Sequence, residues 1–121
     1  EPLVFENELI RSHELLEGYS EIHWFRPGSG RYDDWMLKIL TDHGYRCALG
    51  SIYPLDAHIP STWFAKKVIR WRVKPGAIII LHDSGSRGLR TARLLSDILP
   101  ELRNKGYRIV SLKELQSLAN K

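Results

Sequence analysis

The chain has little cysteine, no long apolar run and no cluster of like charges. Its single cysteine, Cys47, excludes an intrachain disulfide framework and a metal site built from several thiolates. No apolar run approaches the ~20 residues that a bilayer-spanning helix needs, so no membrane span is expected. Lysine and arginine are spread along the chain and the net charge is only +4, so nucleic acid is not expected as a partner.

The remaining composition is that of a globular protein. The chain has 121 residues, of which 43% are hydrophobic and 26% are charged, values close to the average of soluble domains. This length corresponds to one domain, which we expect to span residues 1–121. The chain begins at Glu1 rather than at a methionine, so we expect either a processed chain or a portion of a longer protein.

Helix-like and strand-like segments alternate along the chain. The spacing of apolar residues and the positions of Gly and Pro predict helices over residues 6–17, 32–43, 61–73, 89–105 and from 112 onward. Strands are predicted over residues 22–25, 45–53, 77–81 and 107–110. This order predicts an α/β fold whose strands are mostly parallel. Four strands are too few to close a barrel, so we expect an open sheet or part of a larger one.

Several local signals refine this pattern. Residues 77–81 are five apolar residues without alternation, which is typical of a strand covered on both faces. Pro100 is expected to kink or split the helix that contains it. Ser111, followed three residues later by Glu114, forms a capping box that predicts the start of the last helix. Three tryptophans recur at helical spacing and are expected in the core: Trp35, Trp63 and Trp71.

Polar side chains follow three of the expected strands at their carboxyl ends. Arg26, Asp56 and His82 should open onto one rim, because parallel strands end at the same edge of a sheet. A histidine there suits proton transfer near neutral pH, an aspartate can orient it, and an arginine before a proline can clamp a carboxylate. The ordinary alternatives stay open from the residues alone: a core histidine, a solvated aspartate and a surface arginine. Trp24, on the opposite side of its strand from Phe25, is a candidate to line a groove.

Two other site types have weaker support in the sequence. The histidines and acidic residues do not fall in a recognised ligand spacing, so no metal site formed by this chain alone is expected. The Ser84–Gly88 loop before a helix resembles an anion cradle, although it lacks the glycine and lysine pattern of a phosphate-binding loop. A small nucleotide- or phosphate-binding domain is therefore a further, more weakly supported interpretation of the chain.

Taken in order, the motifs resemble those of the polysaccharide deacetylases, the NodB-homology domain of carbohydrate esterase family 4. They are the run from Trp24 to Gly30 with its Arg-Pro pair, the loop aspartate Asp56, the Ile79-Ile80-Leu81-His82-Asp83 segment and the tail from Arg90 to Leu112. The resemblance covers the whole chain but only the second half of the family domain. It implies an α/β fold that is a partial, distorted (β/α) barrel with mostly parallel strands.

The resemblance also implies an activity and a set of roles. The family removes N-acetyl groups from sugars of chitin or peptidoglycan with a divalent metal, zinc being favoured, and the metal ligands and the catalytic base belong to motifs that precede this sequence. By resemblance, His82 protonates the leaving amine, Asp56 supports it and Arg26 holds the base carboxylate. Leu81 and Ile79 would line the acetyl-methyl pocket, with Trp24 as a further substrate contact.

These implications extend to partners and location. The partners are an N-acetylated polysaccharide and the missing N-terminal half of the domain, and this chain alone is expected to be inactive. A secreted or extracytoplasmic location follows from the resemblance only.

Three departures from the family pattern motivate a second interpretation. Gly28-Ser29 replaces the usual Pro-Tyr after the Arg-Pro pair, and Ala57 and Tyr53 replace a tryptophan and an aspartate around Asp56. Loss of that tryptophan opens one wall of the substrate groove. The alternative is therefore a catalytically inactive carbohydrate-binding or interaction domain of the same fold.

Overall fold

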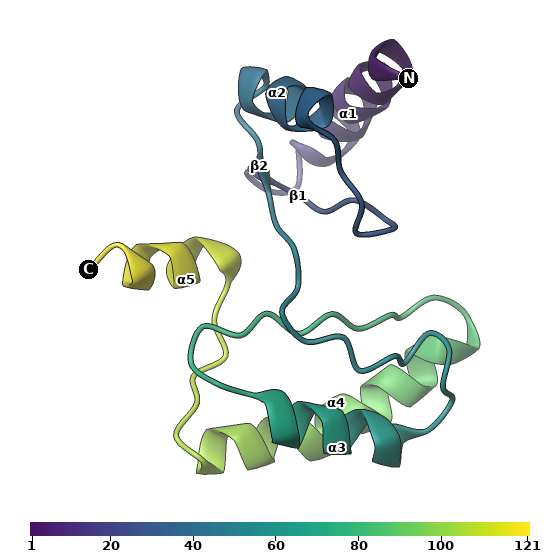
Figure 1. The fold of residues 1–121 in the computed structure, drawn as a ribbon, viewed down its shortest axis with the longest axis vertical. Helices are drawn as coiled ribbons and strands as arrows, with labels where there is room; N and C mark the ends of the chain where they lie inside the picture. Colours follow the sequence, from purple (N-terminus) through teal and green to yellow (C-terminus); the bar gives the residue numbers. More distant parts are fainter. The chain divides into compact units, whose positions relative to one another are not determined.

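The computed structural model describes residues 1–121 (Figure 1). The chain divides into two compact units, Glu1–Leu49 and Gly50–Lys121, which are called unit 1 and unit 2 below and are described separately. Together they contain five helices and two short strands. No helix is both long and apolar enough to cross a membrane.

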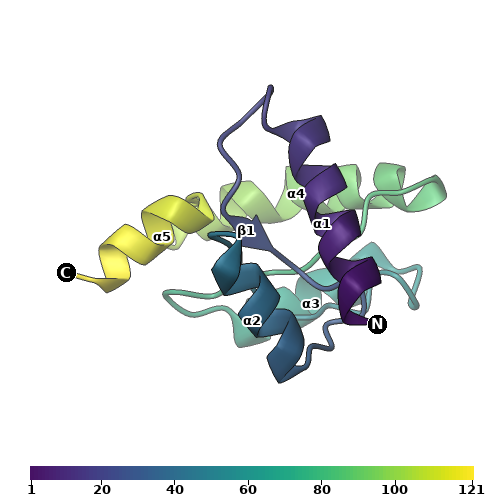
Figure 2. The ribbon, with the colours of Figure 1, turned by 90° about the horizontal axis from the view of Figure 1, so that it is seen from above.

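Unit 1 combines two helices with a short parallel pair of strands, and both helices and the first strand are labelled in Figure 2. Its elements are α1 (Pro2–Leu16), β1 (Trp24–Phe25), α2 (Asp34–Asp42) and β2 (Arg46–Cys47). The strands pair in parallel, with Trp24 opposite Arg46 and Phe25 opposite Cys47. Pro2 lies in the first turn of α1. Backbone N–H groups in this turn have no acceptor within the helix, so a proline there costs no hydrogen bond. Gly44, with φ of 75°, supplies the left-handed turn that ends α2.

The core of unit 1 is small and aromatic. Leu9, Leu40 and Tyr45 are buried, and the Phe5 ring lies edge-on to the rings of Phe25 and Trp35, with centroids 5.4 and 5.6 Å away. Burial raises the pKa of the Tyr45 hydroxyl, which lies 2.6 Å from His13 Nδ1.

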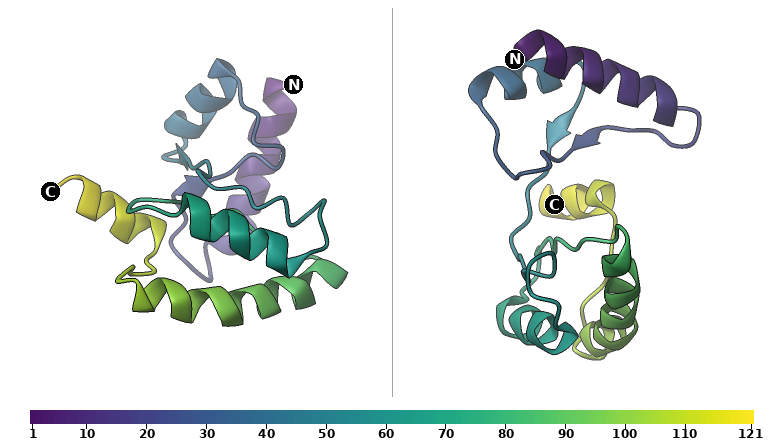
Figure 3. Two further views of the ribbon diagram at one scale, coloured as in Figure 1. Left: turned by 60° about the horizontal axis from the view of Figure 1, so that its bottom comes forward. Right: turned by 90° about the vertical axis from the view of Figure 1, so that its right-hand side faces the viewer.

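Unit 2 packs two long helices side by side, as both views in Figure 3 show. Its helices are α3 (Thr62–Arg72), α4 (Ser86–Asn104) and α5 (Leu112–Ala119). The core joins the first two helices to the extended segment around Ile52 through a cluster of buried residues: Ile52, Ala65, Ile69, Leu94, Ile98 and Leu102. A parallel bridge links Ile52 to Ile79.

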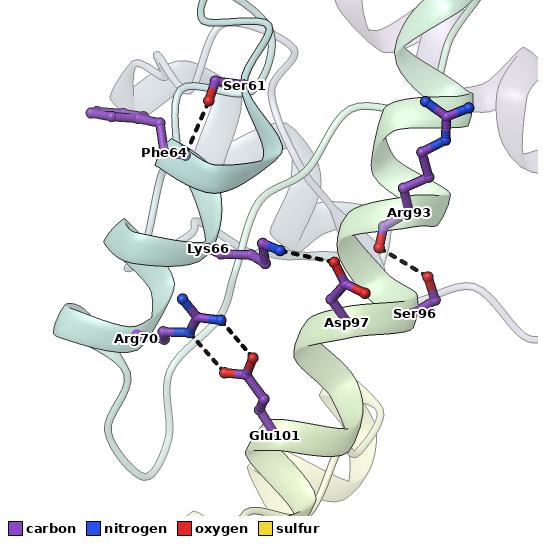
Figure 4. A network of polar contacts seen from close by, with 8 residues as sticks. All are labelled: Ser61, Phe64, Lys66, Arg70, Arg93, Ser96, Asp97 and Glu101. Carbon is purple, nitrogen blue, oxygen red and sulfur yellow. Dashed lines mark hydrogen bonds and ion pairs between the residues drawn. The ribbon is translucent and has the colours of Figure 1, made fainter.

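The exposed edge between α3 and α4 carries ion pairs (Figure 4). Lys66 Nζ lies 2.8 Å from Asp97, and the Arg70 guanidinium binds both carboxylate oxygens of Glu101 at 2.7 and 2.6 Å. The Arg70 hydrogen bond holds the pKa of the Glu101 carboxyl below its usual range. Solvent-exposed ion pairs contribute little to stability, so the apolar cluster beneath them is the main source of packing energy.

The cap predicted at Ser111 is confirmed. Ser111 Oγ accepts the backbone N–H of Glu114 at 3.2 Å, and Ser61 caps α3 in the same way through Phe64 N. The reciprocal half of the capping box is missing, because the Glu114 carboxylate binds Arg108 at 2.5 Å instead.

The expected α/β class with parallel strands is confirmed in its coarse form, whereas the barrel character is not shown. The 45–53 strand is regular only over β2 and resumes pairing at Ile52. Residues 77–81 form a single bridge at Ile79, and residues 107–110 are extended without a paired strand. A ladder forms only where a neighbouring segment offers matching N–H and C=O groups, and these two segments meet few such partners in this chain.

Pro100 does not split its helix. α4 runs unbroken across it, although a proline inside a helix removes one backbone hydrogen bond. Ile98 before the proline and Leu102 after it are both buried in the same cluster. Packing on both sides therefore holds the two halves of α4 in one helix.

The prediction that Trp63 and Trp71 belong to the core is wrong. Their exposed fractions are 63% and 80%. The buried stripe of α3 is formed by Ala65 and Ile69, and a residue two positions away from either lies on the opposite side of the helix. The Lys67 Nζ atom lies 5.0 Å from the ring centroid of Trp63.

Candidate functional site

Unit 2 brings Asp56 and His82 together. One carboxylate oxygen of Asp56, Oδ2, accepts the backbone N–H of His82 at 2.7 Å, and the other, Oδ1, lies 3.0 Å from His82 Nδ1. The Asp56 side chain is only 11% exposed, whereas the His82 side chain is 44% exposed. The aspartate is thus a largely buried support, and the imidazole keeps an open side.

The local backbone explains this contact. Ile52 N donates to Ile78 O, and Ile80 N donates to Ile52 O at 3.0 Å. The next N–H on the same side of the segment belongs to His82, and the Asp56 carboxylate accepts it in place of a strand carbonyl. The Thr91 hydroxyl of α4 donates to the His82 carbonyl oxygen. Both backbone polar groups of His82 are therefore fixed.

The pair determines which ring nitrogen remains available. An ionised carboxylate can only accept hydrogen bonds, so the neutral imidazole carries its proton on Nδ1, toward Asp56 Oδ1. Nε2 then faces away from the carboxylate and is free for another group. This arrangement holds one ring orientation and can pass a proton at Nε2.

Arg26 belongs to unit 1 and follows β1 directly. Its side chain is exposed and makes no hydrogen bond or ion pair. Pro27, next to it, is buried and accepts the N–H of Gly30 at 3.0 Å, which shapes the turn after the strand. Because Arg26 lies in the other unit, the gathering of all three groups at one rim stays a prediction.

The expected substrate contacts belong to both units of the chain. Trp24 is half-buried and lines a pocket of about 230 Å³ in unit 1 with Phe5 and Tyr45. Ile79 and Leu81 pack against the apolar cluster of unit 2 and line a pocket of about 300 Å³, which His82 does not line. Neighbours in an extended segment point to opposite sides, so Leu81 and His82 diverge.

Two further residues next to this site carry little sequence signal. Thr91 belongs to the tail that resembles the family, and its only other signal is that a threonine lies on the apolar side of an expected helix. Leu55 has φ of 60°, a left-handed conformation that leucine rarely adopts and that no sequence signal indicates.

The family resemblance implies a divalent-metal site in the complete domain, with its ligands in motifs that precede this sequence. No group of three or more His, Cys, Asp or Glu side chains could hold a metal ion. Both carboxylate oxygens of Asp56 are engaged by His82, so this pair is not an open ligand set.

Comparison with known sequences finds peptidoglycan deacetylases. A peptidoglycan-N-acetylglucosamine deacetylase of Bacillus cereus is 33% identical over 113 residues, which cover 91% of this chain and 53% of that protein. A second Bacillus cereus protein of the same name is 25% identical over 115 residues, covering 92% of this chain and 42% of its own length. The chain thus spans about half the length of the curated relatives it matches. No protein-family model matches the chain.

Comparison with solved structures finds one fold. A carbohydrate esterase family 4 pseudoenzyme from Bacillus anthracis matches with a TM-score of 0.85 and 21% identity, over 95% of this chain and 40% of the other. A mutant of this pseudoenzyme with restored enzymatic activity also matches with a TM-score of 0.85, so the fold alone does not distinguish an active from an inactive relative. A family 4 carbohydrate esterase from Streptomyces lividans in complex with acetate matches with a TM-score of 0.67 and 20% identity. The match covers 79% of this chain and 53% of the other.

The sequence likeness and the fold likeness point the same way. The matched share of each relative is consistent with the C-terminal half of the domain. The resemblance seen in the motifs is thereby confirmed: the chain is similar in sequence to peptidoglycan-N-acetylglucosamine deacetylases and in fold to part of the carbohydrate esterase family 4 domain.

Proposed function

We propose that the chain is the C-terminal, acid-supplying half of a metal-dependent deacetylase that removes acetyl groups from N-acetylated sugars of a peptidoglycan- or chitin-like polysaccharide. The Asp56–His82 pair is the observation that carries this proposal. Relatives named peptidoglycan-N-acetylglucosamine deacetylase support the substrate class. They also support an extracytoplasmic site of action.

The chemistry requires a positioned acid. Cleavage of an amide expels an amine, which is a poor leaving group until it is protonated. His82 would deliver that proton from Nε2, the ring nitrogen that Asp56 leaves free. Asp56 would hold the ring through Nδ1, and because it also binds the backbone of residue 82 it fixes the position of the ring relative to the strand end.

The other expected roles belong to this proposal as well. Arg26 would hold the carboxylate of the catalytic base, Leu81 and Ile79 would line the acetyl-methyl pocket, and Trp24 would contact the sugar. The metal ligands and the base are proposed to lie in an N-terminal half that this chain does not contain. The chain alone is accordingly expected to show no hydrolysis.

The test replaces His82 in a protein that includes that N-terminal half. His82→Ala should lower the rate of deacetylation of an N-acetylglucosamine oligosaccharide by about 10²- to 10⁴-fold, the contribution of a general acid. His58→Ala is the matched control, because His58 is an exposed histidine of the Asp56 loop and should leave the rate unchanged. An unaltered rate in His82→Ala would remove this histidine from the acid role.

A second candidate function is a catalytically inactive carbohydrate-binding or interaction domain, a state represented among the structural neighbours of the chain by a pseudoenzyme. The replacements at Gly28, Tyr53 and Ala57 point in the same direction. The two candidates separate in one experiment with the complete protein and insoluble peptidoglycan. Binding together with acetate release supports the deacetylase, whereas binding without acetate release supports the inactive domain.

A further inference from the structure

Leu55 is the only residue other than glycine with a positive φ, at 60°. The left-handed conformation brings the Cβ of an L-residue close to its own carbonyl group, and leucine lacks the short polar side chain that lets asparagine adopt it. The Leu55 side chain is 47% exposed, so burial of this side chain does not account for the conformation. Unfavourable backbone conformations of this kind are often retained next to functional residues.

The neighbours of Leu55 define where the chain turns. Pro54, before it, is among the most deeply buried residues. After it, the Leu55 carbonyl accepts the N–H groups of His58 and Ile59 at 3.0 and 2.8 Å, which begins a tight turn. Asp56 therefore lies between a buried anchor and a closed turn, and its direction depends on the backbone of residue 55.

We infer that Leu55 is a positioning residue whose left-handed backbone directs both carboxylate oxygens of Asp56 toward residue 82. In a continuous strand, the side chain of residue 56 would stand roughly perpendicular to the sheet. The N–H group of His82 instead lies along the hydrogen-bonding edge that Ile80 uses with Ile52. A carboxylate reaches that edge only if the chain leaves the strand direction before Asp56, and the reversal of φ at Leu55 provides this change.

This inference concerns the Asp56–His82 contact itself and rests on the proposed function only for its catalytic meaning. Its test therefore measures the contact without any enzyme assay. Loss of the contact in a variant and loss of deacetylation in the complete protein are separate results.

The experiment compares substitutions at Leu55 in the full chain. Leu55→Val disfavours the left-handed conformation through its branched Cβ, whereas Leu55→Gly and Leu55→Asn permit it. The readouts are hydrogen exchange at the backbone N–H of His82 and the ¹⁵N NMR signature of its ring tautomer. Asp56→Ala is the reference for a broken contact, and Ile109→Val, at an exposed position, controls for the loss of a methylene group.

We expect Leu55→Val to speed exchange at His82 by about ten-fold or more and to shift the ring signals toward those of Asp56→Ala. Leu55→Gly and Leu55→Asn should retain the wild-type signals, as should Ile109→Val. The inference is overturned if Leu55→Val keeps the contact. If Leu55→Val does not fold, Leu55→Gly decides alone, because a broken contact in that variant would show that the leucine side chain rather than the backbone conformation directs Asp56.

Discussion

Removing the Asp56 carboxylate should destabilise unit 2 more than removing the imidazole that it supports. Asp56→Ala leaves the backbone N–H of His82 without its acceptor at 2.7 Å and also releases the ring. His82→Ala removes the ring alone, and the N–H of residue 82 keeps its bond to Asp56 Oδ2. The two substitutions therefore differ by the backbone hydrogen bond.

The magnitudes follow from burial and charge. A hydrogen bond to a charged, poorly exposed acceptor contributes about 1.5–3 kcal/mol, and Asp56 is 11% exposed. The ring contact involves an imidazole that is 44% exposed, so solvent screening reduces its contribution to about 0–1 kcal/mol. We expect Asp56→Ala to lower the free energy of unfolding by about 2–3 kcal/mol and His82→Ala by less than about 1 kcal/mol.

Urea denaturation followed by circular dichroism, together with hydrogen exchange at Ile80 of the same unit, measures this difference. Asp83→Ala is the matched control, because Asp83 is an exposed aspartate next to His82 whose side chain makes no hydrogen bond or ion pair. Equal losses in Asp56→Ala and His82→Ala, or a loss in Asp83→Ala as large as in Asp56→Ala, would refute the reasoning.

Two further predictions concern packing and pH. A Cβ at Gly50 would lie 2.2 Å from Ile80 Cγ1, so Gly50→Ala should cost about 1–3 kcal/mol in urea denaturation, whereas Gly18→Ala, with no atom within 4 Å, should not carry this cost. Because the Arg70 hydrogen bond lowers the pKa of Glu101 in the folded state, the stability from this pair is present above the ordinary value near 4.5 and is lost as the pH falls through the lower folded value. Arg70→Gln should therefore lose less stability than the wild type between about pH 5 and about pH 3, and equal losses would contradict the assignment.

Elements that depend on local chemistry could be predicted from the sequence. The Ser111 cap forms because its hydroxyl and the N–H of Glu114 are three residues apart, whatever surrounds them. The Asp56–His82 contact was expected because parallel strands end at one edge, and the structure places both side chains in unit 2. Their catalytic roles, like that of Arg26, stay predictions.

Elements that depend on packing between distant segments could not be predicted from the sequence. The exposure of Trp63 and Trp71 depends on which side of α3 meets α4, and the apolar spacing of this helix did not identify that side. The unbroken helix at Pro100 depends on burial of residues before and after it. Leu55 has a positive φ between a buried proline and a tight turn, and leucine itself carries no sequence signal for that conformation.

The way the main chain is held at residue 82 has a consequence for the proposed activity. Its N–H and C=O groups are bound by Asp56 and Thr91 whatever side chain the residue carries. Under the proposed acid role, replacement of the histidine would therefore remove the proton transfer while the chain kept its fold. Such a change would leave a protein that looks intact, so under the proposed acid role the side chain at position 82, rather than the fold, indicates whether the proton transfer is retained.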